Sequence, residues 1–301
     1  MPRSSNQQEE TRRKKTMPND FNQQVIEEFR ANAGQVGGYF EGARLILLTT
    51  TGARSGKRHT TPLAYYPDGG ASVLVIASAA GAPTHPAWFH NLLAHPQVTV
   101  ETGVFTYEAT AEALAGPERD KAFARLVEAE PGWADYQSKT TRVIPVIALH
   151  EIPVDGPPNV NASSMGEGLK VIHDAFRREL ALIRKEFTAS GPTLGAQLRV
   201  NCLTLCAGLH NHHTGEELGI FPFLAGTRPE LAPALDRLRK EHERIAALTA
   251  ELKRIIGDDS ADPQHARREV ERLTAELETH LAYEEEQLIP ALDAPQTEPT
   301  R

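Results

Sequence analysis

Hydrophobic residues follow different patterns in the two halves of the chain. In the first half they form short runs rich in β-branched residues, separated by turn signals such as Pro-Asp-Gly-Gly, and such runs predict strands. The strand-like runs are residues 43–52, 71–81, 97–103 and 142–154, and residues 118–133 predict an amphipathic helix ended by Pro-Gly. Beyond residue 168 the hydrophobic residues recur at helical spacing. The sequence therefore predicts an α+β protein, with a small β-rich domain followed by a helical one.

A segment without apolar periodicity separates the two halves. Residues 156–168 are rich in Gly, Pro, Ser and Asn, a composition typical of linkers. A chain of 301 residues is also long for a single hydrophobic core. We expect two domains, at residues 22–152 and 168–292, joined by a linker at 153–167 and flanked by tails at 1–21 and 293–301. Residues 1–20 are polar and Gln-rich, and we expect them to be disordered.

Polar residues interrupt the predicted helices in a unit that occurs twice. Each copy has one His, followed by a second His with a Glu four residues after it. A constant offset of 68 residues relates the two helix faces, in the pairs Leu205/Leu273, Leu209/Leu277, His212/His280, Glu216/Glu284, Ile220/Leu288 and Pro222/Pro290. The single histidines, His173 and His242, are 69 residues apart. The candidate site residues are therefore His173, His212, Glu216, His242, His280 and Glu284.

These polar residues are expected to bind metal. A His and a Glu four residues apart lie on one face of a helix, and here that face also carries the Leu and Ile residues of the core. Burying such groups without partners costs roughly 2–7 kcal/mol each, a penalty that a metal ion removes. Nitrogen and carboxylate ligands without thiolates favour a pair of iron or manganese ions over a structural zinc site.

One alternative in this ligand set stays open. His213 and Glu217 form a second His-Glu pair one residue out of phase, and His210 lies one turn away. Only His212 and Glu216 share the repeat offset and the apolar register. We therefore predict that these two are ligands, and that the neighbouring residues lie outside them or face solvent.

The second half resembles a known family. The segments VIHDAFRREL, LHNHHTGEELGIFPFL, LRKEHERIAAL and THLAYEEEQLIPAL are similar to the hemerythrin-type HHE cation-binding domain, an antiparallel four-helix bundle. The resemblance implies a non-haem di-iron site with the six candidate residues as ligands. Oxygen carriers of that family have a further His one turn beyond the third-helix ligand, where this chain has Ala246. This departure favours reaction with, or sensing of, O2, peroxide or NO over simple oxygen carriage.

Two motifs in the first half suggest a ligand site. Residues 49–63 surround cationic side chains with glycines and small hydroxyl residues, a combination suited to an anion. Residues 78–100 run from a glycine-containing segment into an aromatic helix and then a strand. Trp88 and Phe89 at the start of that helix are interpreted as core residues that could also cap a pocket.

Together these motifs resemble the deazaflavin-dependent nitroreductase family, split β-barrel proteins that bind coenzyme F420. The similar features are TTGxRSGK, the PDGG hairpin, PxWxxNLxAxPxV and DYQSKTTRxIPV. The resemblance implies contacts with the coenzyme tail phosphate from Arg54, Ser55, Gly56 and Lys57. It places Thr61, Pro62 and Leu63 beside the ring system, and Ser78, Ala79, Trp88 and Asn91 on the other side. Ala79 and His59 stand where some members have Lys and Arg, which implies weaker binding of the tail.

The implied chemistry is hydride transfer from the deazaflavin to a quinone or nitroaromatic acceptor, with Tyr136 donating a hydrogen bond or proton. An ordinary flavin such as FMN is the alternative cofactor. We therefore expect an F420H2-dependent oxidoreductase fused to a non-haem di-iron domain. The alternative function is an oxygen, nitric oxide or iron sensor in which the barrel only holds the cofactor. A homo-oligomer built on the bundle is a further option.

Composition limits the possible partners and location of the protein. The formal charge of −8 argues against nucleic acid as a partner, and no apolar run is long enough to span a membrane. No secretory signal is apparent, and we expect a cytoplasmic protein. Cys202 and Cys206 lie four residues apart among leucines, and we expect them to be reduced core thiols.

Overall fold

A computed structural model describes residues 18–154, 159–190, 193–258 and 260–294. The predicted tail residues 1–17 and 295–301, and linker residues 155–158, lie outside these ranges. The sequence-based boundary of the first tail is wrong in one respect, because residues 18–21 form the first turn of helix α2 (Pro18–Ala31). None of the helices in the described ranges has both the length and the hydropathy needed to cross a membrane.

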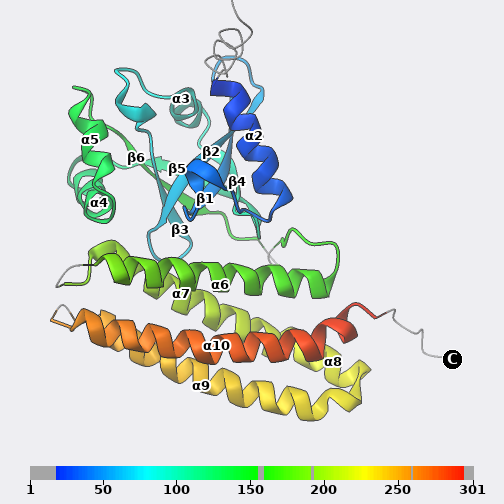
Figure 1. Ribbon diagram of the computed structural model, residues 1–301. Helices are drawn as coiled ribbons and strands as arrows, with labels where there is room; N and C mark the ends of the chain where they lie inside the picture. Colours follow the sequence, from blue (N-terminus) through cyan, green and yellow to red (C-terminus); the bar gives the residue numbers. More distant parts are fainter. Residues whose placement is uncertain (1–17, 155–158, 191–192, 259, 295–301) are drawn as a thin grey trace, which may run out of the picture.

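Six antiparallel strands form a closed barrel in the first half (Figure 1). The order around the barrel is β1-β2-β3-β6-β5-β4, and β4 pairs with β1 to close it. The strands are β1 (Leu45–Thr51), β2 (Arg58–Pro67), β3 (Ser72–Ile76), β4 (Gln97–Glu101), β5 (Thr106–Ala113) and β6 (Val146–Glu151). The fold class predicted for this half is therefore confirmed.

The most apolar strands are buried on both faces. In β1, Ile46 and Leu48 point into the barrel, whereas Leu45 and Leu47 pack against α2 on the outside. Strands β3 and β6 likewise send alternate residues to the barrel interior and to helix α4 (Gly116–Ala129). Because both faces of these strands are buried, their sequences are continuous hydrophobic runs. This is why the strands could be predicted from the sequence.

Strands β2 and β5 were not predicted. Strand β5 alternates buried alanines, such as Ala109 and Ala111, with exposed Glu and Thr residues, so it lacks a hydrophobic run. Helices α3 (Ala87–Ala94) and α5 (Gly132–Ser138) complete the outer layer, with short 3-10 turns at Gly38–Phe40 and Ala79–Gly81.

The second half is a helical bundle, as predicted. Helices α6 and α7 are neighbours, α9 lies beside α7, and α10 packs against both α9 and α6. The bounds are α6 (Met165–Ala189), α7 (Ala196–Gly215), α8 (Phe221–Thr227), α9 (Ala232–Ile256) and α10 (Pro263–Leu292), with a π-helical turn at Glu216–Ile220 between α7 and α8. Helix starts have local causes: Ser164 caps α6 by accepting from the Glu167 N–H, and Asp262 caps α10 ahead of Pro263.

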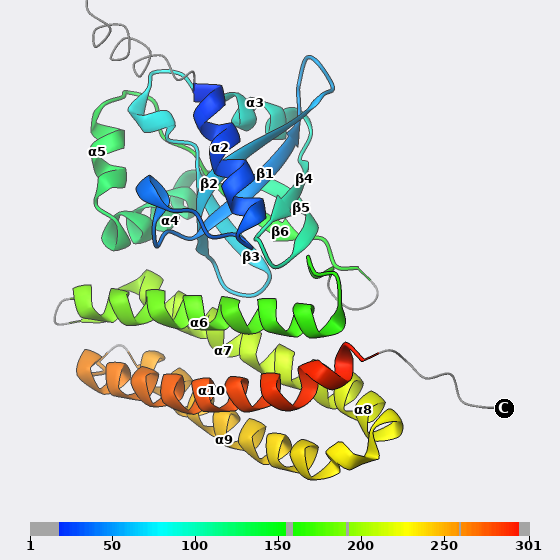
Figure 2. The same ribbon diagram turned by 45° about the vertical axis from the view of Figure 1, so that its right-hand side comes forward.

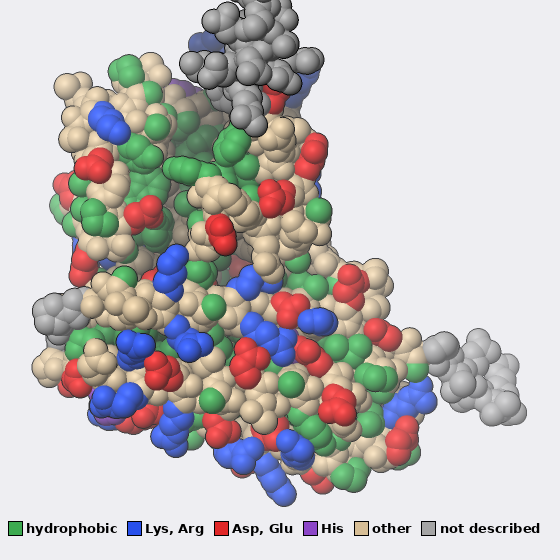
Figure 3. All heavy atoms as spheres, viewed as in Figure 1, with side chains coloured by type: hydrophobic (Ala, Val, Ile, Leu, Met, Phe, Trp, Pro, Cys, Tyr) green, Lys and Arg blue, Asp and Glu red, His purple; other side chains and the backbone are tan. Residues whose placement is uncertain are grey.

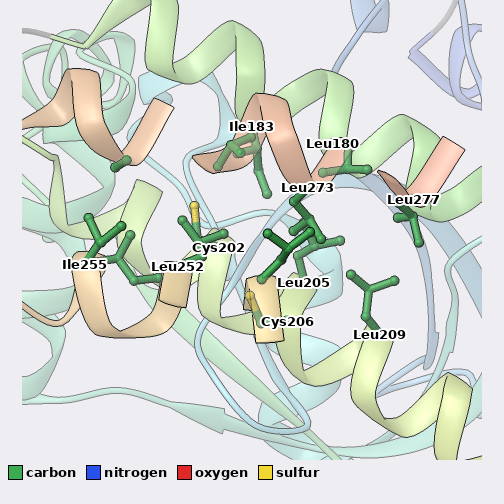
Figure 4. Close-up of a cluster of buried hydrophobic side chains, with 14 of the residues drawn as sticks. Leu180, Ile183, Cys202, Leu205, Cys206, Leu209, Leu252, Ile255, Leu273 and Leu277 are labelled. Atoms are coloured by element: carbon green, nitrogen blue, oxygen red, sulfur yellow. The ribbon is translucent and has the colours of Figure 1, made fainter. Parts of the chain in front are cut away.

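Leucines from all four long helices fill one end of the bundle. Leu180, Leu205, Leu252 and Leu273 belong to this cluster (Figure 4), and each is almost completely buried. Cys202 and Cys206 lie in the same cluster as free thiols, so their predicted place in the core is confirmed. Burial raises the pKa of both thiols, to about 11 for Cys206.

Helix α6 lies along the barrel side of the bundle (Figures 1 and 2). At this boundary the nearly buried Arg44 bonds to Glu179 and Glu186 of α6, at 2.6 and 2.5 Å. The Gln197 side chain of α7 donates to the carbonyl of Pro67 at the end of β2. On the face in Figure 3, charged side chains gather over the bundle and hydrophobic ones over the barrel.

Candidate functional site

A layer of buried polar residues divides the bundle interior. The leucine cluster around Leu205 and Leu252 lies on one side of it, and a second cluster around Phe221 and Leu288 lies on the other. All six residues predicted as metal ligands lie in this layer: His173 on α6, His212 on α7, Glu216 at the start of the π turn, His242 on α9, and His280 and Glu284 on α10. Four packed helices therefore bring the two copies of the repeat together.

The layer contains two groups of donor atoms. His213, His242 and His280 form one group, and their nitrogen atoms lie within 4.8 Å of one another. His173, His212, Glu216 and Glu284 form the other, within the same distance. Sets of three and four mutually close donors are the arrangement expected for two neighbouring ions.

Two carboxylates connect the groups. The Oε1 atom of Glu216 is 3.2 Å from Nε2 of His212, and its Oε2 atom is 3.5 Å from Nε2 of His242. Oε2 of Glu284 is 3.5 Å from Nε2 of His173 and 3.4 Å from Nε2 of His280. Each carboxylate thus faces a histidine from both groups, so either one could be shared between two ions held there.

Outer carboxylates orient three of the histidines. Nδ1 of His173 lies 3.0 Å from Glu285, Nδ1 of His242 lies 2.9 Å from Glu217, and Nδ1 of His280 lies 3.1 Å from Glu241. A carboxylate accepts, so each Nδ1 carries the proton and each Nε2 presents its lone pair to the centre. Carboxylate–histidine pairs of this kind are regular companions of metal ligands.

Several of the central atoms have no hydrogen-bond partner among the described residues. The buried atoms without a hydrogen bond include Nε2 of His213, His242 and His280, and both oxygens of Glu216 and Glu284. Burial lowers the pKa of His280 to about 4 and raises that of Glu284 to about 8, and the pKa of Glu216 is raised by burial and by Glu284. Unpaired lone pairs and desolvated carboxylates fit a site for cations.

His213 was expected to lie outside the ligand set or to face solvent. It does not face solvent, because its side chain is buried and its ring stacks on His242 with centroids 4.1 Å apart. Glu217 is placed as expected, outside the centre on His242. His210 is exposed. Burial is the largest cause of the lowered pKa of His213.

A second candidate site lies on the barrel, at the turn between β1 and β2. Arg54, Ser55 and Lys57 are exposed there, around Gly56 with a φ of 65°. The turn is fixed by Asn91 of α3, whose Oδ1 accepts from the Ala53 N–H at 3.0 Å. Neither Arg54 nor Lys57 has an ion-pair partner among the described residues. Two free cations beside a glycine turn fit a phosphate group.

The strand after the turn continues the site. In β2, Thr61 and Leu63 are partly exposed and Pro62 is buried. Asn91 also donates from Nδ2 to Thr50 of β1 at 3.1 Å, which ties α3 to the barrel. Trp88 is buried in the barrel core, in agreement with its interpretation as a core residue.

Ser78 and Ala79 begin a strained loop that approaches α5. Ala79 and Ala80 both have positive φ, at 46° and 52°, which is costly for residues with a Cβ. At Gly81, with φ of 82°, a Cβ would lie 2.8 Å from the carbonyl oxygen of Tyr136. The structure therefore brings Gly81, at the end of this loop, close to the backbone of Tyr136.

Arg142, which the sequence analysis did not assign a role, holds this loop. Its guanidinium donates to the carbonyls of Ala82 at 2.8 Å, Ala77 at 3.1 Å and Ser78 at 2.5 Å. Every residue has a backbone carbonyl, so the sequence contains no signal that would identify Arg142 as the donor to this loop.

Tyr136 is half-buried beside Trp133, with ring centroids 5.8 Å apart. Lys139 lies 5.1 Å from the Tyr136 ring centroid. Across from it stands Tyr39, which is 80% exposed, and a hydrogen bond with Tyr136 raises the pKa of Tyr39. The phenol hydroxyls of Tyr39 and Tyr136 therefore lie within hydrogen-bonding distance of each other.

Comparison with known families assigns each half. Residues 22–151 match the family described as F420H(2)-dependent quinone reductase. Residues 165–292 match the family described as hemerythrin HHE cation binding domain. Both matches agree with the resemblances found in the sequence.

Individual relatives match the first half. An F420H(2)-dependent quinone reductase of Mycobacterium tuberculosis is 37% identical over 125 residues, which cover 40% of this chain and 83% of the relative. A solved F420-H2 dependent reductase is 41% identical over 36% of this chain and 94% of its own, with a TM-score of 0.33. A solved domain-swapped dimer is 36% identical over 44% of this chain and 100% of its own, with a TM-score of 0.35.

Proposed function

Because the chain belongs to the F420H(2)-dependent quinone reductase family, we propose that it is an oxidoreductase that uses reduced coenzyme F420 to reduce a quinone or nitroaromatic compound. Its hemerythrin HHE domain adds a non-haem metal centre, for which we propose two iron ions. The observation that carries the first part is the β1–β2 turn. It presents at an exposed position two cations, Arg54 and Lys57, that have no ion-pair partner in the described ranges, and this suits a phosphate-bearing coenzyme.

The proposed coenzyme site follows the β1–β2 turn and the strand after it. Arg54 and Lys57 supply positive charge for the tail phosphate, and Ser55 and Gly56 supply a hydroxyl and close backbone approach. Thr61, Pro62 and Leu63 line the ring system along β2, opposite Ser78 and Ala79. Asn91 supports the turn through Ala53, and Trp88 anchors α3 in the barrel.

When bound, the reduced deazaflavin supplies a hydride to the acceptor. The protein's own contribution is to orient both molecules and to provide a proton. Tyr136 stands beside the Ser78–Gly81 loop with its ring packed on Trp133, so its hydroxyl has a defined position. We assign it the role of donating a hydrogen bond or proton to the acceptor oxygen.

The proposed metal centre holds its ions through His173, His212, Glu216, His242, His280 and Glu284. The two carboxylates each face histidines of both groups, which supports a pair of ions over a single one. Nitrogen and oxygen donors without thiolates suit iron. O2 and NO are the small molecules that we propose for this centre.

An anaerobic assay tests the reductase activity. The protein is mixed with F420H2 and a soluble benzoquinone, and coenzyme oxidation is followed by absorbance. We expect turnover, with a KM for F420H2 that rises in Arg54→Ala and Lys57→Ala because a phosphate contact is lost. Lys121→Ala, an exposed change on α4, is the matched control and should leave KM unchanged.

The same experiment separates the two candidate functions. Tight binding of F420H2 without oxidation in the presence of quinone would contradict the enzyme and favour a sensor. Binding of FMN in preference to F420 would contradict the proposed coenzyme.

A further inference from the structure

His213 is a buried histidine of the polar layer that neither the repeat nor the family resemblance accounts for. The residue is only 7% exposed, and its Nε2 atom has no hydrogen-bond partner within the part of the chain that the structure describes. The ring stacks on His242 at 4.1 Å and meets His280 edge-on at 5.2 Å. An unpaired nitrogen in this position needs a partner.

The register of the repeat explains why His213 faces inward. The residue 68 positions after His213 is Leu281, which is fully buried in the leucine cluster. On α7 itself, His213 follows Leu209 by four residues, just as Cys206 follows Cys202. Positions three and four residues along a helix share one face, so His212 and His213 both border the interior.

Helix α9 cannot supply the same nitrogen. One turn beyond His242 it carries Ala246, which is exposed and has no donor atom. The histidine group at this end of the layer would therefore contain only His242 and His280 without a contribution from α7.

We propose that His213 is the third nitrogen ligand of the ion held by His242 and His280. Resting on the di-iron centre proposed above, this assignment gives seven protein ligands. The imidazoles of His213, His242 and His280 then bind one ion, and those of His173 and His212 bind the other. Glu216 and Glu284 are available to both ions. The absence of a His at position 246 does not leave the centre short of a nitrogen.

A purely structural role for His213 predicts a different behaviour. A structural imidazole would be stabilising in the metal-free protein, through a hydrogen bond to Nε2. No such bond exists among the described residues, so without metal this nitrogen destabilises the core. The two roles therefore predict opposite changes in the stability of the metal-free protein when the nitrogen is removed and the ring stacking is kept.

The test uses the full chain carrying His213→Phe, His213→Gln, or the control His210→Gln at an exposed position of the same helix. Each protein is made metal-free, loaded with Fe(II) anaerobically, desalted, and measured for iron per chain. We expect about two ions in wild type and in His210→Gln, and about one in both His213 variants. The weakened ion should lose more than the roughly 10–100-fold in affinity that changes in outer carboxylates cause.

A thermal melt of the metal-free proteins completes the test. We expect His213→Phe to melt at the same temperature as wild type or higher, because a buried unpaired nitrogen is replaced by a ring that still stacks. A lower midpoint together with two retained ions would overturn the assignment of His213 alone. Wild-type protein that retained no iron would overturn the proposed metal centre, and this inference with it.

Discussion

At the scale of single residues, hydrogen bonds in the buried layer decide which nitrogen each histidine presents. Glu217, Glu241 and Glu285 each accept from a histidine Nδ1, which leaves Nε2 free toward the centre. Arginines neutralise two of these carboxylates, with Arg237 on Glu241 and Arg177 on Glu285. The pKa of Glu285, despite its partial burial, is lowered to about 2 by His173 and Arg177. The pKa of Glu241 is lowered as well, so Glu241 and Glu285 stay ionised and keep His280 and His173 oriented.

We predict that Glu241→Gln weakens iron binding by about 10–100-fold without abolishing it, the typical effect of losing an outer carboxylate. The amide can still accept from His280 but no longer fixes the ring as firmly. Fe(II) titration of the metal-free protein measures the change. Glu243→Gln, an exposed change on the same helix, is the control, and an equal loss there would contradict the prediction.

A second prediction at this scale concerns the core thiols. Burial raises the pKa of Cys206 to about 11 and raises that of Cys202 as well, so neither forms a thiolate at pH 8. A disulfide-exchange reagent should label no cysteine of the native protein at pH 8, and two after unfolding in guanidinium. Rapid labelling of the native protein would show that the helices open locally.

At the scale of elements, the loop from Ser78 to Ala82 depends on a donor from another segment. Two consecutive alanines adopt positive φ there, and such strain persists only where the surroundings hold it. Arg142 provides this support by binding three carbonyls of the loop and its flanks, with Nδ1 of His85 3.1 Å from Nη1. Because the loop approaches the backbone of Tyr136 at Gly81, its shape bears on the coenzyme site proposed above.

We predict that Arg142→Met raises the KM for F420H2 by about 10-fold or more, with a smaller effect on kcat. Hydrogen bonds from a charged donor contribute about 1.5–3 kcal/mol each, and about 1.4 kcal/mol corresponds to a factor of ten. Steady-state kinetics measure both constants, with Lys121→Met as the control. An unchanged KM would mean that the loop keeps its shape without Arg142.

At the scale of the whole molecule, the barrel and the bundle are joined through α6. This helix carries His173 on its bundle side and Glu179 and Glu186 toward Arg44 of the barrel. Arg44 is only 9% exposed, and both carboxylates raise its pKa against the effect of burial. The same helix therefore contributes to the buried polar layer and to the domain boundary.

We predict that Arg44→Met lowers the free energy of unfolding by about 3 kcal/mol, since removing one partner of a buried ion pair leaves uncompensated charge. Because Glu179 and Glu186 are partly exposed, we expect this loss at the lower end of the range for breaking a buried ion pair. Guanidinium denaturation measures it. Arg30→Met breaks a more exposed pair with Glu101 and should cost less than about 1 kcal/mol.

The sequence by itself determined the two-domain architecture and six members of the buried layer. Strands β1, β3 and β6 are buried on both faces, so their residues are apolar without interruption, and the repeat places His and Glu on a face that must be buried. Both signals are local, because they depend only on the period of a strand or helix.

Only the tertiary structure decided the place of β5, the role of Arg142, the outer carboxylates and the inward position of His213. Each depends on which elements pack together: β5 is buried through small alanines, and Arg142 reaches a loop about 60 residues away in the sequence. Whether His213 faces the interior depends on how widely the bundle covers one face of α7. Spacing along a chain sets which residues share a face, and packing sets how much of that face is enclosed.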